Sequence, residues 1–204
     1  MDCLYLDTET TSLNPGQICE LSVIHESNFN FVSAKNYFFT VDSMDAGAQS
    51  VHGYSIENLI DLSNGKKFGD FKDELLELLS NKVLVAHNLP FDEKFISSEF
   101  WRTGVSFKPA GRLDTMEYFN PILALPNKYK KYGKYKNPKL SEVIDYLKID
   151  NAKVQELCTK IYGGDDKDIS YHDSRFDTTA MYVAVNVQRE RLHGHGQWTL
   201  NFCF

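Results

Sequence analysis

The chain has 204 residues, 42% of them hydrophobic, and a formal net charge of −6. This length is enough for one substantial hydrophobic core. The negative net charge argues against a protein that binds polyanions such as nucleic acid through its overall charge. No apolar run approaches membrane-spanning length and the start of the chain lacks the stretches typical of a signal peptide, so we expect a cytoplasmic protein without a membrane partner.

The first third of the chain is predicted to form a small antiparallel meander. Alternating or apolar segments joined by short polar connections predict strands at about 2–8, 18–25 and 36–42. A helix follows, because four apolar residues recur at helical spacing: Phe71, Leu75, Leu78 and Leu79. The apolar run V-L-V-A at 83–86 is then typical of a short buried strand.

The remainder of the chain is predicted to be mostly helical. We expect the following elements: a helix from residue 91, a strand near 112–114, and helices at about 139–147, 151–162 and 174–192. Strands that alternate with helices after a meander predict an α/β fold with a mixed five-stranded sheet flanked by helices. We expect a single domain over residues 1–192 and a tail over residues 193–204.

The cysteines are scattered through the chain and lack C-x-x-C spacing. Cys3 and Cys19 fall in predicted core strands, whereas Cys158 and Cys203 lie far along the sequence. This distribution favours reduced thiols over a disulfide framework or a zinc site.

Two acids occupy the end of the first predicted strand. Side chains alternate between the faces of a strand, so Asp7 and Glu9 in Y-L-D-T-E share one face and converge at its end. Asp92 begins a helix on the same stripe as core residues Phe95 and Ile96, so it is expected to point inward. Asp177 repeats this arrangement on the last helix.

Such inward carboxylates need a positive partner. Burying them without one is costly, and oxygen ligands suit Mg²⁺ or Mn²⁺ better than zinc. A pair of these ions roughly 3.5–4 Å apart can stabilise the attacking and leaving oxygens of a phosphoryl transfer. His172, in H-D-S-R-F-D at 172–177, is a candidate proton acceptor for the attacking water.

Each cluster alone has an ordinary explanation. D-T-E is common in solvated turns, an aspartate is favoured at a helix N-terminus, and H-D-S is typical of a helix cap. The three clusters together, in this order and spacing, favour one metal site over three unrelated local features.

The motifs resemble those of the DEDDh 3′–5′ exonucleases, the family that includes the proofreading subunit of the bacterial replicative DNA polymerase. The matching segments are D-T-E-T-T-S-L at 7–13, H-N-L-P-F-D at 87–92 and H-D-S-R-F-D at 172–177. Histidine and aspartate are five residues apart in the third, as in that family. Ser12 departs from the pattern, because the family usually has glycine there.

The resemblance implies a ribonuclease H-like fold and a metal-dependent nuclease. Asp7, Glu9, Asp92 and Asp177 would bind two Mg²⁺ or Mn²⁺ ions, and His172 would deprotonate the attacking water. The products would be nucleoside 5′-monophosphates released from 3′ ends. Four further residues match positions that contact the terminal nucleotide in relatives: Thr8, Leu13, His52 and Asn88.

Two segments outside these motifs suggest contacts with substrate and partner. The segment 127–139 carries six lysines with interleaved tyrosines, a pattern that suits a single-stranded nucleic acid and also a merely solvated loop. In the tail, Gln197, Leu200 and Phe202 form Q-x-x-L-x-F, which resembles the peptide with which bacterial replication proteins bind the sliding clamp. The alternative is that Trp198 and Phe202 pack on the domain.

Three functions remain open from the sequence. The first is an exonuclease acting on single-stranded or frayed ends, with DNA favoured over RNA. The second is an exoribonuclease of the same family, because the motifs do not distinguish the sugar. The third is a nucleic-acid or replisome binding module without turnover, which the presence of all five chemical residues disfavours.

Overall fold

A computed structural model of the chain describes residues 1–14, 16–128, 134–163 and 173–193. The strands are β1 (Asp2–Thr10), β2 (Ile18–Ser27), β3 (Asn30–Phe38), β4 (Val83–Ala86) and β5 (Gly111–Asp114). The helices are α1 (Ala46–His52), α2 (Ile56–Ser63), the short 3₁₀ helix η1 (Phe68–Phe71), α3 (Lys72–Leu79), α4 (Leu89–Arg102), α5 (Thr115–Leu123), α6 (Leu140–Leu147), α7 (Asn151–Tyr162) and α8 (Ser174–His193).

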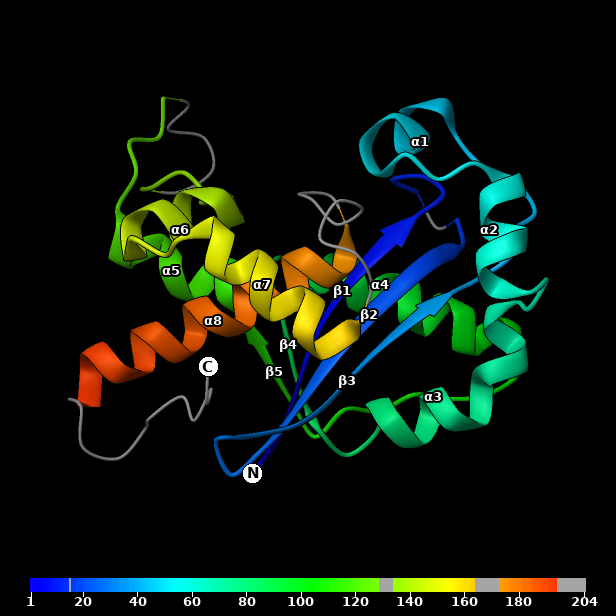
Figure 1. Cartoon of the computed structure of the whole chain (residues 1–204), viewed down its shortest axis with the longest axis horizontal. Helices are drawn as coiled ribbons and strands as arrows, with labels where there is room; N and C mark the ends of the chain where they lie inside the picture. Colours follow the sequence, from blue (N-terminus) through cyan, green and yellow to red (C-terminus); the bar gives the residue numbers. More distant parts are fainter. Residues whose placement is uncertain (15, 129–133, 164–172, 194–204) are drawn as a thin grey trace.

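The strands form one mixed sheet in the order β3-β2-β1-β4-β5. The predicted meander is confirmed, because β1, β2 and β3 pair antiparallel. Strands β4 and β5 continue the sheet parallel to β1. Figure 1 shows the five strands side by side, with α1 and α2 at one end of the molecule and α5 and α6 at the other.

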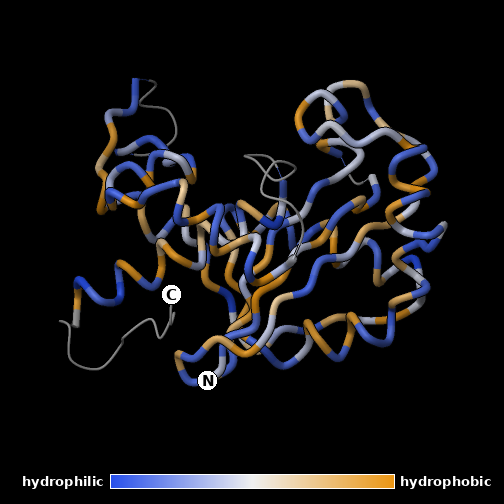
Figure 2. Tube along the Cα trace, in the orientation of Figure 1, coloured by the Kyte–Doolittle hydropathy of each residue, from blue (hydrophilic) through white to orange (hydrophobic). Residues whose placement is uncertain are grey.

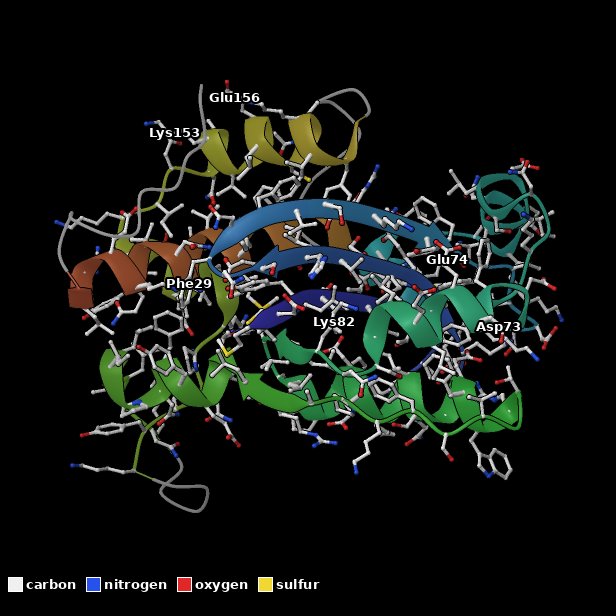
Figure 3. All side chains as sticks on the ribbon, turned by 90° about the horizontal axis from the view of Figure 1, so that it is seen from below. Phe29, Asp73, Glu74, Lys82, Lys153 and Glu156 are labelled. Atoms are coloured by element: carbon white, nitrogen blue, oxygen red, sulfur yellow. The ribbon has the colours of Figure 1, made fainter. Side chains whose placement is uncertain are left out.

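Helices cover both faces of the sheet. Figure 3 shows α7 and α8 on one side and α3 and α4 on the other. On the α3 side, Glu74 accepts hydrogen bonds from Lys35 Nζ and Tyr37 Oη of the edge strand β3, both at 2.8 Å. These contacts cover one face of an edge strand that is otherwise largely exposed.

The alternation of β1 divides the core into two layers. Leu4 and Leu6 pack in the cluster that also contains residues of α3 and α4. Cys3 and Tyr5 face the other way and pack on α8, where the Tyr5 and Tyr182 rings meet edge to face at 4.9 Å. Figure 2 shows hydrophobic segments along the strands and alternating hydrophobic and hydrophilic residues along α3.

The predicted third strand, 36–42, was placed too late. Strand β3 begins at Asn30 and ends at Phe38. Its first half is an exposed edge with a poor apolar signal, although Phe31 and Val32 belong to it. Phe39 and Val41 lie after the strand has ended and are buried, and Phe39 N still donates to the carbonyl oxygen of Cys19 on β2 at 2.9 Å.

Three helices were absent from the expectation. Helix α1 has no buried residue and therefore no apolar stripe to reveal it. Helix α2 is defined by its capping box, in which Ser55 and Asn58 exchange side-chain to main-chain hydrogen bonds. Helix α5 is capped by Asp114, the residue before it, whose side chain accepts from Met116 N at 2.9 Å.

The thiol prediction is confirmed for the cysteines that the structure describes. Cys3, Cys19 and Cys158 are buried and not joined in disulfides, whereas Cys203 lies outside the described residues. None of the helices in the described ranges is both long and apolar enough to cross a membrane.

Candidate active site

The sheet brings three segments of the chain to one edge. Strands β1, β4 and β5 are parallel, so their carboxyl ends meet there, and the antiparallel β2 begins at the same place. Asp7 and Glu9 lie at the end of β1, and Asp92 lies in the first turn of α4, shortly after β4 ends. Ligand sites of open α/β sheets commonly form at such an edge.

Asp92 is held against β1 by two hydrogen bonds. Its Oδ1 accepts from Thr8 N at 3.1 Å and from Thr8 Oγ1 at 2.8 Å. The predicted inward direction is confirmed, because Asp92, Phe95 and Ile96 are all buried. These bonds stabilise the charged carboxylate, whereas burial raises its pKa to about 7.

Asp177 brings a fourth acid from α8. It lies in the first turn of that helix, on the side where Met181 and Ala184 are buried. Burial raises the pKa of Asp7 well above its usual range, and the negative charges of Asp92, Asp177 and Glu9 raise it further. The carboxylates of β1, α4 and α8 are therefore close enough to repel one another.

Glu9 experiences the same effect. Burial raises its pKa to about 9, and the next contribution comes from Glu20, its partner in the β1–β2 register. Within the described ranges, no three acidic, histidine or cysteine side chains are gathered tightly enough to form a complete ion-binding group. The donor set itself, buried oxygen acids that raise one another's pKa, fits hard divalent cations.

A cavity of about 800 Å³ opens beside the acids. Glu9 lines it together with three of the predicted nucleotide contacts, Thr8, Leu13 and His52. Leu13 is 83% exposed, so its apolar side chain is available at this wall. The fourth predicted contact, Asn88, does not line the cavity; its main-chain N–H donates to Asp114 Oδ1 at 3.0 Å where α4 begins.

His52 is fixed in orientation. Its Nδ1 accepts a hydrogen bond from Tyr54 N at 3.1 Å, so the neutral ring carries its proton on Nε2. The two rings are stacked at 5.4 Å, and burial lowers the pKa of the imidazole. The cavity wall therefore presents a neutral, rigid histidine at neutral pH.

His87 joins two separate parts of the chain through both of its ring nitrogens. Its Nδ1 lies 3.0 Å from Thr115 Oγ1 and its Nε2 lies 2.9 Å from the Pro138 carbonyl oxygen. The second contact ties the motif after β4 to the end of the lysine-rich segment 127–139. Within that segment, Lys136 pairs with Glu142 at 2.5 Å.

Some predicted residues lie outside the described ranges. These are His172, the middle of the lysine-rich segment at 129–133, and the tail residues Gln197, Leu200 and Phe202. The sequence reasoning in turn missed Glu20, which is fully buried at the same edge as the acids. A charged residue inside the apolar strand I-C-E-L-S-V was the signal that could have found it.

The sequence is similar to known exonucleases. A sequence model of the exonuclease family matches residues 4–129, more than half of the chain. The chain is 36% identical over 102 residues to the DNA polymerase III subunit epsilon of Rickettsia felis, covering 47% of this chain and 43% of that protein. It is 30% identical over 149 residues to the 3′–5′ exonuclease DinG of Staphylococcus haemolyticus, covering 72% of this chain and 16% of that protein.

The fold is also that of solved exonucleases. The zinc-bound complex of E. coli exonuclease I with single-stranded DNA superposes with a TM-score of 0.65 at 16% identity, covering 93% of this chain and 40% of that chain. Exonuclease X in complex with 5′-overhanging duplex DNA gives a TM-score of 0.58 at 17% identity, covering 95% and 94%. With the ribonuclease H-like sheet and the matching family model, the chain belongs to the DEDDh-type 3′–5′ exonuclease family.

Proposed function

We propose that this chain removes nucleotides from the 3′ ends of single-stranded or frayed DNA and releases nucleoside 5′-monophosphates. The observation that supports the proposal is that the negative charges of Asp92, Asp177 and Glu9, from three separate segments, raise the pKa of Asp7, and that Glu9 lines the cavity together with Leu13 and His52. DNA is favoured because the matched relatives include subunits of a DNA polymerase.

The four acids would hold two Mg²⁺ or Mn²⁺ ions. Thr8 orients the carboxylate of one of these acids, Asp92, through two hydrogen bonds. When bound, such ions supply electrostatic stabilisation of the attacking and leaving oxygens. We assign to His172 the removal of a proton from the attacking water. Leu13 and His52 would position the terminal nucleotide in the cavity.

Two alternatives compete with this function. An exoribonuclease of the same family would use the same acids and differ in its contacts to the sugar. A binding module without turnover would keep the fold and lose the reaction. The same assay separates all three functions.

The assay uses purified protein with DNA and RNA oligonucleotides of one sequence, labelled at the 3′ or the 5′ end. We expect Mg²⁺ or Mn²⁺ to give shortening from the 3′ end of the DNA, and chelator to stop it. Faster shortening of RNA would establish the exoribonuclease. Binding without shortening of either substrate, in either metal, would contradict a nuclease.

A replication partner is a further part of the proposal. Relatives named as DNA polymerase III subunits suggest a polymerase partner, and Gln197, Leu200 and Phe202 would bind the sliding clamp. We expect immobilised clamp to retain the full chain and to release a truncation that ends at His195. Equal retention of both proteins would refute docking through the tail.

A further inference from the structure

Helix α8 is attached to strand β2 by two arginine–glutamate pairs. Arg175 Nε lies 3.8 Å from Glu20 Oε1, and Arg189 Nη2 lies 3.1 Å from Glu26 Oε1. The two arginines are separated by about 21 Å of helix and the two glutamates by about 20 Å of strand, at 1.5 and about 3.3 Å per residue. Both pairs therefore form at once, and α8 runs alongside β2 in the same direction.

The pair at the acidic end is part of a larger network. The Arg175 guanidinium makes a bidentate contact with the Asp173 carboxylate: Nη2 donates to Oδ2 at 2.6 Å and Nε donates to Oδ1 at 2.9 Å. Asp173 Oδ1 also accepts from Arg175 N at 3.0 Å, which satisfies an amide at the start of α8. Tyr54 Oη donates to Asp173 Oδ2 at 3.5 Å.

Glu20 holds the main chain of the same turn. It is fully buried, and its Oε2 accepts from Ser174 N at 3.4 Å while its Oε1 accepts from Asn36 Nδ2 at 2.9 Å. The Ser174 hydroxyl lies 2.6 Å from that of Ser22 on β2. The start of α8 is thus bound to the sheet through both backbone and side chains.

This turn carries one of the four acids of the site. The main-chain N–H of Asp177 donates to the carbonyl oxygen of Asp173 at 3.1 Å, which is the first helical hydrogen bond after the network. A buried ion pair is poor evidence of stabilisation by itself, because desolvation offsets much of the attraction. The buried Arg175–Glu20 pair can instead serve to fix the position of the neighbouring acid, Asp177.

We propose that Glu20, Arg175 and Asp173 form a positioning unit that sets Asp177 for divalent metal binding. The unit rests on the proposed function, since it serves the same site. Arg175 is a positioning residue and not a ligand, because it acts through Asp173 and the helix start. Groups that orient metal ligands in this way commonly change metal affinity by about 10–100-fold when they are removed.

Whether Arg175→Gln raises or lowers the affinity for a divalent cation distinguishes a positioning role of Arg175 from a purely electrostatic one. Arg175→Gln removes a cation beside a cluster of acids, so electrostatics alone would make the variant bind a divalent cation more tightly. Positioning predicts the reverse, a loss of about 10–100-fold in affinity. We would measure Mn²⁺ binding by calorimetry on the full chain without nucleic acid, so that the result does not depend on turnover.

Arg189→Gln is the matched control, because it breaks the other arginine–glutamate pair between the same helix and the same strand. We expect it to lower the melting temperature and to leave Mn²⁺ affinity unchanged. Arg175→Lys keeps the charge but loses the bidentate contact with Asp173, so its Mn²⁺ affinity should fall between those of the wild type and Arg175→Gln.

The outcomes separate the two proposals. A wild-type protein that binds no Mn²⁺ contradicts the metal site itself and removes the basis of the unit. Wild-type binding with equal or tighter binding by folded Arg175→Gln overturns the positioning unit alone. If Arg175→Gln does not fold, Arg175→Lys decides the question, and wild-type affinity in that variant overturns the unit.

Discussion

Asp7→Asn should abolish hydrolysis and, in the absence of metal, make the protein more stable. Asparagine keeps the shape of the side chain and cannot ionise, whereas burial, and then the charges of Asp92, Asp177 and Glu9, raise the pKa of Asp7, so that its ionisation destabilises the fold. Loss of a metal ligand removes several kcal/mol of transition-state stabilisation, or about 10³-fold or more in rate. Relief of about 1 kcal/mol of repulsion would raise the melting temperature by about 2–4 °C.

The gain in stability should depend on pH. The folded-state pKa of Asp7 lies above that of the unfolded chain, so its favourable contribution is complete below about pH 4 and is lost as pH rises through the raised value. In chelator, the melting temperature of Asp7→Asn should therefore exceed that of the wild type increasingly from pH 5 upward. Added Mn²⁺ should reverse the order, because it stabilises the wild type preferentially.

Asp2→Asn is the control for this experiment, because Asp2 lies at the opposite end of the same strand and is exposed. We expect wild-type hydrolysis from it. Hydrolysis by Asp7→Asn within about tenfold of the wild-type rate, or a metal-free melting temperature no higher than that of the wild type, would show that Asp7 does not belong to the acidic cluster as proposed.

His172→Ala is expected to slow the reaction by about 10²–10⁴-fold while the protein still binds Mn²⁺ and DNA. A general base contributes to the chemical step and not to the affinity for metal or substrate. Single-turnover rates with saturating Mn²⁺ measure that step directly. The rise of the wild-type rate with pH on the acidic side, which reports deprotonation of the base, should be lost in the variant.

His25→Ala provides the comparison for this variant. His25 lies on β2, far along the strand from the acidic edge, and burial lowers its pKa without placing it near the four acids. It should retain the wild-type rate and pH profile. A His172→Ala rate within a few-fold of the wild type would leave the attacking water without its assigned base.

The local patterns of the sequence predicted much of the fold and of the placement of the acids. Strand alternation placed Asp7 and Glu9 on one face, and a helical stripe placed Asp92 among Phe95 and Ile96, because periodicity is a property of neighbouring residues. Helix α1 escaped detection because it buries nothing, and β3 was misplaced because its edge position removes the apolar alternation.

The contacts that complete the site depend on residues far apart in the chain. Arg175 meets Glu20 only because α8 folds back along β2, and no pattern within either segment reveals the pair. Tyr54 reaches Asp173 across a similar separation. Such pairs need the topology before they can be predicted, whereas stripes and caps need only the local sequence.

The last residues of β1 serve both layers of the molecule. Thr8 holds Asp92 of α4 from one face of the strand, while Asp7 and Glu9 extend from the other face, where the charge of Asp177 from α8 acts on both. Because neighbouring side chains alternate, inserting or deleting one residue in this strand would exchange the two sides at once. Homologues should therefore tolerate substitutions along β1 far better than any change in its length.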